Sequence, residues 1–237
     1  MRSIKKLIKA IFPLFGLEYR QLAFPVFRSN VYSQNGEDGV IEFILKKIPS
    51  LPRFIVDIGA NDGVETSNSR LLIKKYDFDG LLIEPYPPAF EKLKELYQNQ
   101  RGITLCSQAI GATSHEGVIN WHGHFQNRSM PIHQVNEILK SFALPQEIGF
   151  LSIDIDGQDN EVLQSVDWRR FRPWIVIAEI DSSSHANLQQ QIAIMDHAEY
   201  HPMLHIGNVF YVRKDLAGQY FFNWKTTVTD QFGLFRT

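Results

Sequence analysis

Residues 54–63, FIVDIGANDG, decide how this chain folds. An apolar run of three residues ends in Asp57, and the chain then turns through Gly59 and Gly63. A buried strand followed at once by a glycine turn is typical of a parallel sheet that presents a nucleotide-like ligand at the carboxyl end of a strand. The alternative is a tight strand-to-helix turn that needs glycine only for its backbone angles.

The side chains in this turn favour one kind of ligand. A dinucleotide-binding turn has glycines in a G-x-G-x-x-G pattern, and here those positions hold Gly59, Asn61 and Val64. The middle glycine lets the backbone approach a pyrophosphate, whereas Asn61 has a side chain in that place. The carboxylate of Asp57 would repel a phosphate but would pair with an ammonium group. We therefore expect a nucleoside that carries an amino acid, which is S-adenosylmethionine.

Length and composition bound the class of protein. The chain has 237 residues, enough for one α/β domain with a sizeable core. Its net charge of −2 gives no support for a nucleic-acid partner. A single cysteine, Cys106, excludes an intrachain disulfide and a cysteine-rich metal site, and it indicates a reducing, cytoplasmic compartment.

The amino terminus, residues 1–16, has a pattern of its own. Apolar residues recur at helical spacing on one face, and basic residues occupy the other. One interpretation is a helix that lies on the anionic inner face of a membrane and brings the protein to a lipid-linked substrate. The other is a helix that packs on the domain or on a second subunit of a homo-oligomer. The sequence leaves both open.

Strand and helix patterns alternate along the rest of the chain. Helices are expected over residues 37–48, 66–76, 88–100, 132–142, 160–166 and 186–200. Strands are expected over residues 54–58, 81–84, 103–110, 149–155 and 174–180, with an edge strand over 117–121, a polar loop over 122–131, and a closing hairpin of 201–206 and 209–214.

This alternation predicts a Rossmann-like, doubly wound α/β fold. We expect a seven-stranded sheet that is mostly parallel, with one antiparallel strand in the carboxyl-terminal hairpin. Residues 1–50 are expected to form a helical extension, and residues 51–237 a single domain. A ligand would lie where the strand order reverses, at the strand over 54–58.

Polar residues at the ends of the next two strands complete a nucleoside site. Glu84 comes 21 residues after Gly63, near the spacing at which an acid meets a ribose diol. A carboxylate accepts hydrogen bonds from both hydroxyls at once, so it selects for ribose. At the same sheet edge, the side chain of Gln108 and the backbone near Ala109 are expected to pair with an adenine.

Four carboxylates fall at the ends of two further strands. Asp154 and Asp156 alternate at the end of one apolar strand, and Glu179 and Asp181 at the end of the next. They could hold a divalent cation through oxygen ligands, bind the ligand or take a proton, or cap helices, as Asp156 is placed to do. The sequence does not decide among these, so no metal ligand is assigned.

Eight stretches together resemble the FkbM-type methyltransferases, a family with the class I S-adenosylmethionine-dependent fold. They are YSQNGEDGVI (32–41), FIVDIGANDG (54–63), TSNSRLL (66–72), GLLIEPYPPAFEKL (80–93), AIG (109–111), FLSIDIDGQDNEVL (150–163), RPWIVIAEI (172–180) and GNVFYVRKDL (207–216). The resemblance implies methyl transfer to an oxygen, often on a sugar or a glycosylated product. By this similarity, the residues that face the donor would be Asp57, Gly59, Asn61, Glu84 and Asp154, with Gln34, Glu37, Asp38 and Asn68 over its methionine end.

The acceptor side is less defined. An acceptor hydroxyl must lose a proton during transfer, and histidine suits that role near neutral pH. The candidate bases are His122, His124, Asp156 and His185. Two other functions remain alternatives, namely an NAD-type oxidoreductase and a non-catalytic module that binds the donor or a membrane.

Overall fold

The computed structural model describes residues 29–119, 128–155, 157–180 and 185–220. Its helices are α2 (Glu37–Lys47), α3 (Arg70–Tyr76), α4 (Pro87–Tyr97), α5 (Val135–Ser141), α6 (Asp159–Ser165), α7 (His185–His197) and α8 (Lys214–Tyr220). Its strands are β1 (Phe54–Ile58), β2 (Asp79–Ile83), β3 (Ile103–Cys106), β4 (Ala109–Gly111), β5 (His115–Ile119), β6 (Arg128–Gln134), β7 (Phe150–Ile153), β8 (Ile175–Glu179), β9 (Tyr200–His205) and β10 (Asn208–Arg213).

The central sheet has seven strands in the order β3-β2-β1-β7-β8-β10-β9. The chain runs outward from β1 through β2 to β3, and then returns to the other side of β1 as β7, so the switch point lies between β1 and β7. Pairing is parallel except that β10 is antiparallel to both β8 and β9. The predicted fold class, including its single reversed strand in the closing hairpin, is confirmed.

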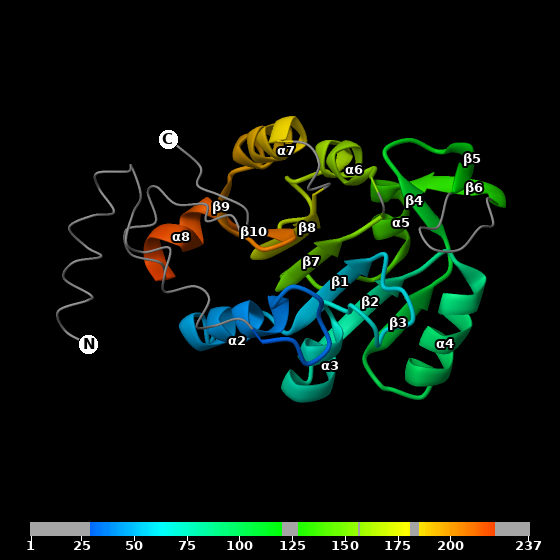
Figure 1. The fold of residues 1–237 in the computed structure, drawn as a ribbon, viewed down its shortest axis with the longest axis horizontal. Coiled ribbons are helices and arrows are strands. Elements are labelled where there is room, and N and C mark those ends of the chain that lie inside the picture. The colour runs from blue at the N-terminus through cyan, green and yellow to red at the C-terminus, as the bar shows by residue number, and fades with distance from the viewer. Residues whose placement is uncertain (1–28, 120–127, 156, 181–184, 221–237) are drawn as a thin grey trace.

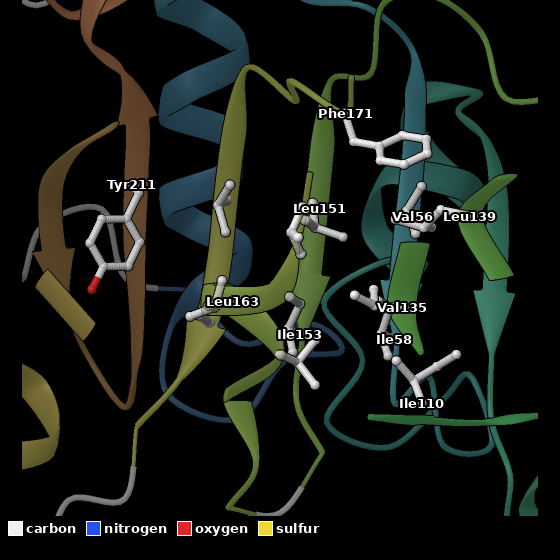
Figure 2. Packing of buried hydrophobic residues seen from close by; sticks show 14 of the residues in the cluster. Val56, Ile58, Ile110, Val135, Leu139, Leu151, Ile153, Leu163, Phe171 and Tyr211 are labelled. Carbon is white, nitrogen blue, oxygen red and sulfur yellow. The ribbon is translucent and has the colours of Figure 1, made fainter. Parts of the chain in front are cut away.

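Strand β1 has apolar side chains on both faces, as is usual for a central parallel strand, and Asp57 is its one charged residue. Val56 and Ile58 point into one core cluster, together with Leu151 and Ile153 of β7 (Figure 2). Ile55, on the opposite face, belongs to a second cluster. The alternation of side chains along a strand therefore divides the hydrophobic core into two layers.

Helices cover both faces of the sheet (Figure 1). Those on the first face, α5, α6 and α7, contribute residues such as Val135, Val162 and Leu188 to the first cluster. Those on the second face, α2, α3, α4 and α8, contribute residues such as Ile44 and Leu93 to the second. Helix α2 thus packs into the core of the domain, whereas residues 1–28 lie outside the described part of the chain.

A separate three-stranded sheet, β4-β6-β5, was not predicted. The expected strand over 103–110 divides into β3 and β4, and β4 leaves the main sheet to pair with β6. Part of the expected polar loop is strand β6, so α5 begins at Val135 and not at 132. A Cβ on Gly111 or Gly117 would lie 2.6 or 2.3 Å from the side chain of Ile132, so these glycines make room for Ile132 between the strands.

Helix α3 also begins later than predicted, at Arg70 and not at 66. Thr66 has a left-handed backbone with φ of 55°, which an α-helix cannot contain. Within the described ranges, no helix combines the length and the apolarity that crossing a bilayer would need.

Candidate functional site

A cavity of about 280 Å³ opens at the carboxyl edge of the sheet, beside the switch point. This volume is near the lower limit of about 300 Å³ for small-molecule sites. Three groups of residues line it, from the glycine turn, from the ends of β2 and β7, and from the small sheet. They are Ile58, Gly59, Ile83, Glu84, Pro85, Gln108, Ile110, Val118, Ile119, Ile132, Asp154, Ile155 and Gln158.

Gly59 lets the turn after β1 approach the neighbouring strand closely. Its φ is +90°, and a Cβ at this position would lie 1.7 Å from the carbonyl oxygen of Asp154. The N–H groups of Gly59 and Ala60 both donate to the carbonyl oxygen of Ile83 (2.9 and 3.0 Å). A side chain cannot be accommodated here, so backbone alone forms this part of the cavity wall.

Glu84 presents a carboxylate that is fixed at both oxygens. Oε2 accepts the N–H of Asn61 (2.9 Å), and Oε1 accepts the N–H of Tyr86 (2.6 Å). The residue is 6% exposed and lines the cavity. Each carboxylate oxygen has a second lone pair, so the group can accept two hydroxyl hydrogen bonds without moving. Asn61 contributes its backbone here, in a left-handed conformation.

Part of the cavity lining is apolar. It comes from Val118 and Ile119 of β5, Ile132 of β6, Ile110 and Ile155. Beside them, Gln108 accepts a hydrogen bond at Oε1 from the Cys106 thiol (3.6 Å), which leaves its amide N–H groups as donors. An apolar slot with one carboxamide suits a flat, hydrogen-bonding ring such as a nucleobase.

Asp57 lies next to this cavity but does not line it. Its carboxylate is 3% exposed, on the face of β1 that carries Ile55. Burial raises its pKa to about 6, and hydrogen bonds from the hydroxyls of Ser69 and Ser152 offset part of that rise. The amide of Asn68 donates to the Ser152 hydroxyl (3.2 Å), so two predicted site residues share one buried polar network.

The two acids at the start of α2 hold a loop in place. Asp38 Oδ2 accepts the N–H groups of Val31, Tyr32 and Ser33 at 2.7, 2.6 and 3.0 Å. Glu37 accepts the N–H of Asn35 (2.7 Å) and the Asn208 side chain of β10 (3.2 Å).

These contacts give Glu37 and Asp38 a structural role. The loop that they hold contacts the segment after the glycine turn, where the Ser67 N–H donates to the Tyr32 carbonyl (3.2 Å). Gln34 is exposed on this loop. Glu37 and Asp38 are 0% and 1% exposed, and neither lines the cavity.

A smaller polar cavity of about 60 Å³ lies on the other side of the turn after β7. It is lined by Gly157, Asp159, Asn160, Glu161, Glu179, Ile180, Asn187 and Gln190. Burial, and then the charge of Glu179, raise the pKa of Asp159 to about 7, against hydrogen bonds from the backbone. A buried amide, Gln191, donates to the Glu179 carbonyl (2.8 Å) and to Asn160 (3.1 Å) and so ties α7 to this region.

Several predicted residues lie outside the described part of the chain. These are His122, His124, Asp156 and Asp181, and the side chain of His185. Their proposed roles as bases stay predictions. Among the described residues, no group of three or more His, Cys, Asp or Glu side chains could hold a metal ion. A divalent cation therefore has no support from the described residues.

The structure thus gathers part of the predicted site at one cavity. Gly59, Glu84, Gln108 and Asp154 line it, and Ala109 follows Gln108 as a fully buried residue at the start of β4. The edge strand expected over 117–121 overlaps β5, but its pairing with β6, which lies in the expected polar loop, was missed. Sequence reasoning also missed Asp159, whose signal would have been an acid placed two residues after Gly157.

A doubly wound sheet with a glycine turn and a fixed carboxylate beside a cavity at its switch point is typical of α/β proteins that bind a nucleoside-containing ligand. Residues 57–204 match the methyltransferase FkbM domain, which is more than half of the chain. The chain belongs to the FkbM methyltransferase family. This membership favours methyl transfer over the oxidoreductase alternative. No curated protein matches the chain.

Solved structures of methyltransferases are similar in fold. The FkbM methyltransferase of Methylobacillus flagellatus is 16% identical, with 68% of this chain and 43% of that one covered and a TM-score of 0.48. The precorrin-6y C5,15-methyltransferase of Geobacter metallireducens is 12% identical, with 78% and 90% covered and a TM-score of 0.46. A Streptococcus mutans protein in complex with SAH is 10% identical, with 72% and 94% covered and a TM-score of 0.44. The chain spans less than half the length of the Methylobacillus protein.

Proposed function

We propose that this protein is an S-adenosylmethionine-dependent O-methyltransferase that acts on a hydroxyl of a saccharide, a glycolipid or another glycosylated product. The observation that best supports binding of this donor is the fixed carboxylate of Glu84. The N–H groups of Asn61 and Tyr86 hold both its oxygens at the cavity wall. Family membership supports methyl transfer. The motif resemblance supports an oxygen atom as acceptor.

We assign parts of the proposed donor to residues of the cavity and of its surroundings. Glu84 would accept the two ribose hydroxyls. The apolar slot with Gln108 would take the adenine, and the backbone at Gly59 would approach the amino-acid portion, next to Asp57. When bound, the donor supplies a methyl group that its sulfonium has already activated.

The protein's own contribution is orientation, exclusion of water and removal of one proton. Apolar residues such as Ile110, Ile119 and Ile155 would exclude water from the bound nucleoside. The acceptor would approach from the side of the turn after β7, where carboxylates and carboxamides can bind hydroxyl groups. Asp156, His122, His124 and His185 remain the candidate bases.

The test is methyl transfer itself. The full chain would be incubated with S-adenosylmethionine labelled in the methyl group and with fractionated cell-surface glycans and glycolipids. We expect the mass of one saccharide class to increase by one methyl, and Glu84→Ala to abolish the increase. Labelling of peptides or amines, with no labelled saccharide, would contradict the acceptor class while leaving the donor site intact.

We also propose that residues 1–16 bring the enzyme to the inner face of an anionic membrane, where a lipid-linked acceptor would be available. The support is the basic and apolar patterning of that segment. Co-sedimentation of the full chain with anionic liposomes, and its loss when residues 1–16 are deleted, is the expected result. A chain that never sediments but changes its oligomeric state on deletion would favour the subunit-packing alternative.

A further inference from the structure

The described residues from Asp154 to the start of α6 at Asp159 line two cavities. Asp154, Ile155 and Gln158 line the larger cavity. Gly157 and Asp159, from the same segment, line the smaller one. A small change in the path of this backbone would therefore alter both cavities at once.

Asp159 holds the backbone of this segment. The N–H of Asp154 still donates to Ile58 of β1 (3.0 Å), but the pairing of β7 with β1 ends at Ile153. Beyond it, Oδ1 of Asp159 accepts the N–H of Ile155 (3.2 Å) and Oδ2 accepts the N–H of Gly157 (3.1 Å). One carboxylate thus accepts two backbone N–H groups that lie beyond the end of β7.

This arrangement is costly for the folded state. Asp159 is 6% exposed and lies near a second acid, Glu179. Both burial and the neighbouring charge disfavour its ionised form. Its hydrogen bonds to the backbone offset part of this cost, and buried acids with a raised pKa are found often at functional sites.

We propose that Asp159 is a positioning residue for methyl transfer, which fixes the turn so that Asp154, Ile155 and Gln158 present a preformed wall to the donor. This inference rests on the proposed function, since the larger cavity is taken as the donor site. Asp159 acts through the backbone of the turn and does not itself line that cavity.

The test is Asp159→Asn in the full chain, because an asparagine has one acceptor oxygen and cannot accept both N–H groups. We expect S-adenosylhomocysteine to bind about tenfold more weakly in calorimetry, consistent with the loss of one hydrogen bond to a charged group. Amide exchange in peptides over residues 150–160 should become faster, while the free energy of unfolding at pH 8 stays equal or rises. A purely structural role would lower stability and leave the affinity unchanged, and that result would overturn the proposal.

The matched control is Asp167→Asn. Asp167 also accepts a backbone N–H, from Arg169 (3.3 Å), but it lines neither cavity. Its substitution should leave the affinity unchanged. Should Asp159→Asn not fold, Asp159→Glu, which keeps the charge and displaces both oxygens, is expected to show the same loss of affinity. Wild-type affinity in the glutamate variant would then overturn the proposal.

The exchange measurement separates this inference from the proposed function. If the wild-type chain binds no S-adenosylhomocysteine, the proposed donor is wrong. Slow exchange over residues 150–160 in the wild type and fast exchange in Asp159→Asn would still show that Asp159 holds the wall. Equal exchange in the two proteins would contradict it.

Discussion

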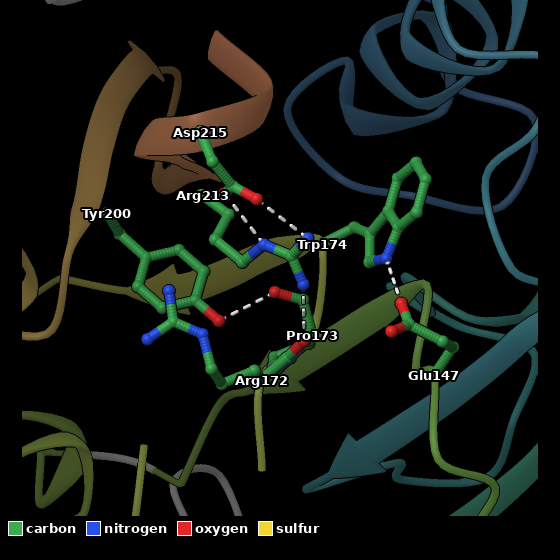
Figure 3. A network of polar contacts seen from close by, with 7 residues as sticks. All are labelled: Glu147, Arg172, Pro173, Trp174, Tyr200, Arg213 and Asp215. Carbon is green, nitrogen blue, oxygen red and sulfur yellow. Dashed lines mark hydrogen bonds and ion pairs between the residues drawn. The ribbon is translucent and has the colours of Figure 1, made fainter. Parts of the chain in front are cut away.

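The two edges of the seven-stranded sheet carry charge in different ways. At the carboxyl edge, the acids Asp57 and Asp159 are buried, and burial is the main cause that raises the pKa of each. At the amino edge, where β8 begins and β10 ends, the charges are paired (Figure 3). There Arg213 donates to both carboxylate oxygens of Asp215, at 2.8 and 2.9 Å.

The amino edge has partners for each of its main polar groups. The Tyr200 hydroxyl donates to the Pro173 carbonyl (2.6 Å), and the Trp174 indole donates to Glu147 (2.5 Å) (Figure 3). Partial burial works against the charge of Asp215, but the hydrogen bonds and charge of Arg213 outweigh it and lower its pKa. The paired groups at the amino edge stabilise the fold. At the carboxyl edge, the buried acids beside the cavity lower the stability of the fold.

The largest effect is expected from Glu84→Ala at the carboxyl edge. The change removes a carboxylate that would accept two ribose hydroxyls, and hydrogen bonds to a charged group contribute about 1.5–3 kcal/mol each. We expect the affinity for S-adenosylhomocysteine, measured by calorimetry, to fall about 100-fold.

The control for this prediction is Glu147→Ala at the amino edge. Glu147 accepts a hydrogen bond from the Trp174 indole, but it lies at the opposite end of the strands. The Glu147→Ala variant should bind S-adenosylhomocysteine with the affinity of the wild type. Equal losses in the two variants would mean that the edges do not differ in function.

The next effect concerns Asp57→Asn and the pH dependence of stability. The folded-state pKa is raised from 3.8 to about 6, so the folded protein holds this proton when the unfolded chain has lost it. Stability from this group is therefore complete below about pH 4 and is lost as the pH rises through about 6, a change of about 3 kcal/mol. Denaturant unfolding between pH 4 and 8 should show this slope in the wild type and a smaller slope in Asp57→Asn.

The same variant should lose donor affinity at neutral pH while it gains stability there. Opposite signs are expected because the carboxylate would pair with the donor's ammonium group but is costly to bury. A variant that loses both affinity and stability would show that Asp57 is a structural group.

The smallest effect is expected from Asp215→Asn at the amino edge. Its pKa is lowered on folding, so its contribution is present above the unfolded pKa and is lost as the pH falls through the folded value. The side chain is 59% exposed, which limits the contribution to at most about 1 kcal/mol. Near pH 7 the variant should be slightly less stable, and below the lowered pKa of the folded protein it should match the wild type. Any change in donor affinity would contradict the separation of the two edges.

Much of the fold could be predicted because buried parallel strands are continuous apolar runs. Residues 54–56 and 175–178 are such runs, and glycine or proline residues punctuate the sequence between them. The small sheet could not be predicted, since β5 is exposed along most of its length and β6 contains Pro131. Strand pairing and the packing of Ile132 against Gly111 and Gly117 hold its strands together. The pattern of apolar and polar residues within each strand does not predict these contacts.

The candidate site also has residues that could be predicted from the sequence and residues that could not. Gly59, Glu84 and Asp154 could be predicted because the ends of parallel strands meet at one edge. The buried roles of Glu37 and Asp38 could not, because an acid that binds backbone N–H groups has the same sequence signal as one that binds a ligand.

The central claim is that the cavity beside Glu84 binds an adenosyl group that carries an amino acid. Calorimetry of the full chain with S-adenosylhomocysteine and, separately, with NAD tests it most directly. We expect saturable binding of S-adenosylhomocysteine that Glu84→Ala weakens about 100-fold, and no binding of NAD. Binding of NAD with no heat from S-adenosylhomocysteine would contradict it.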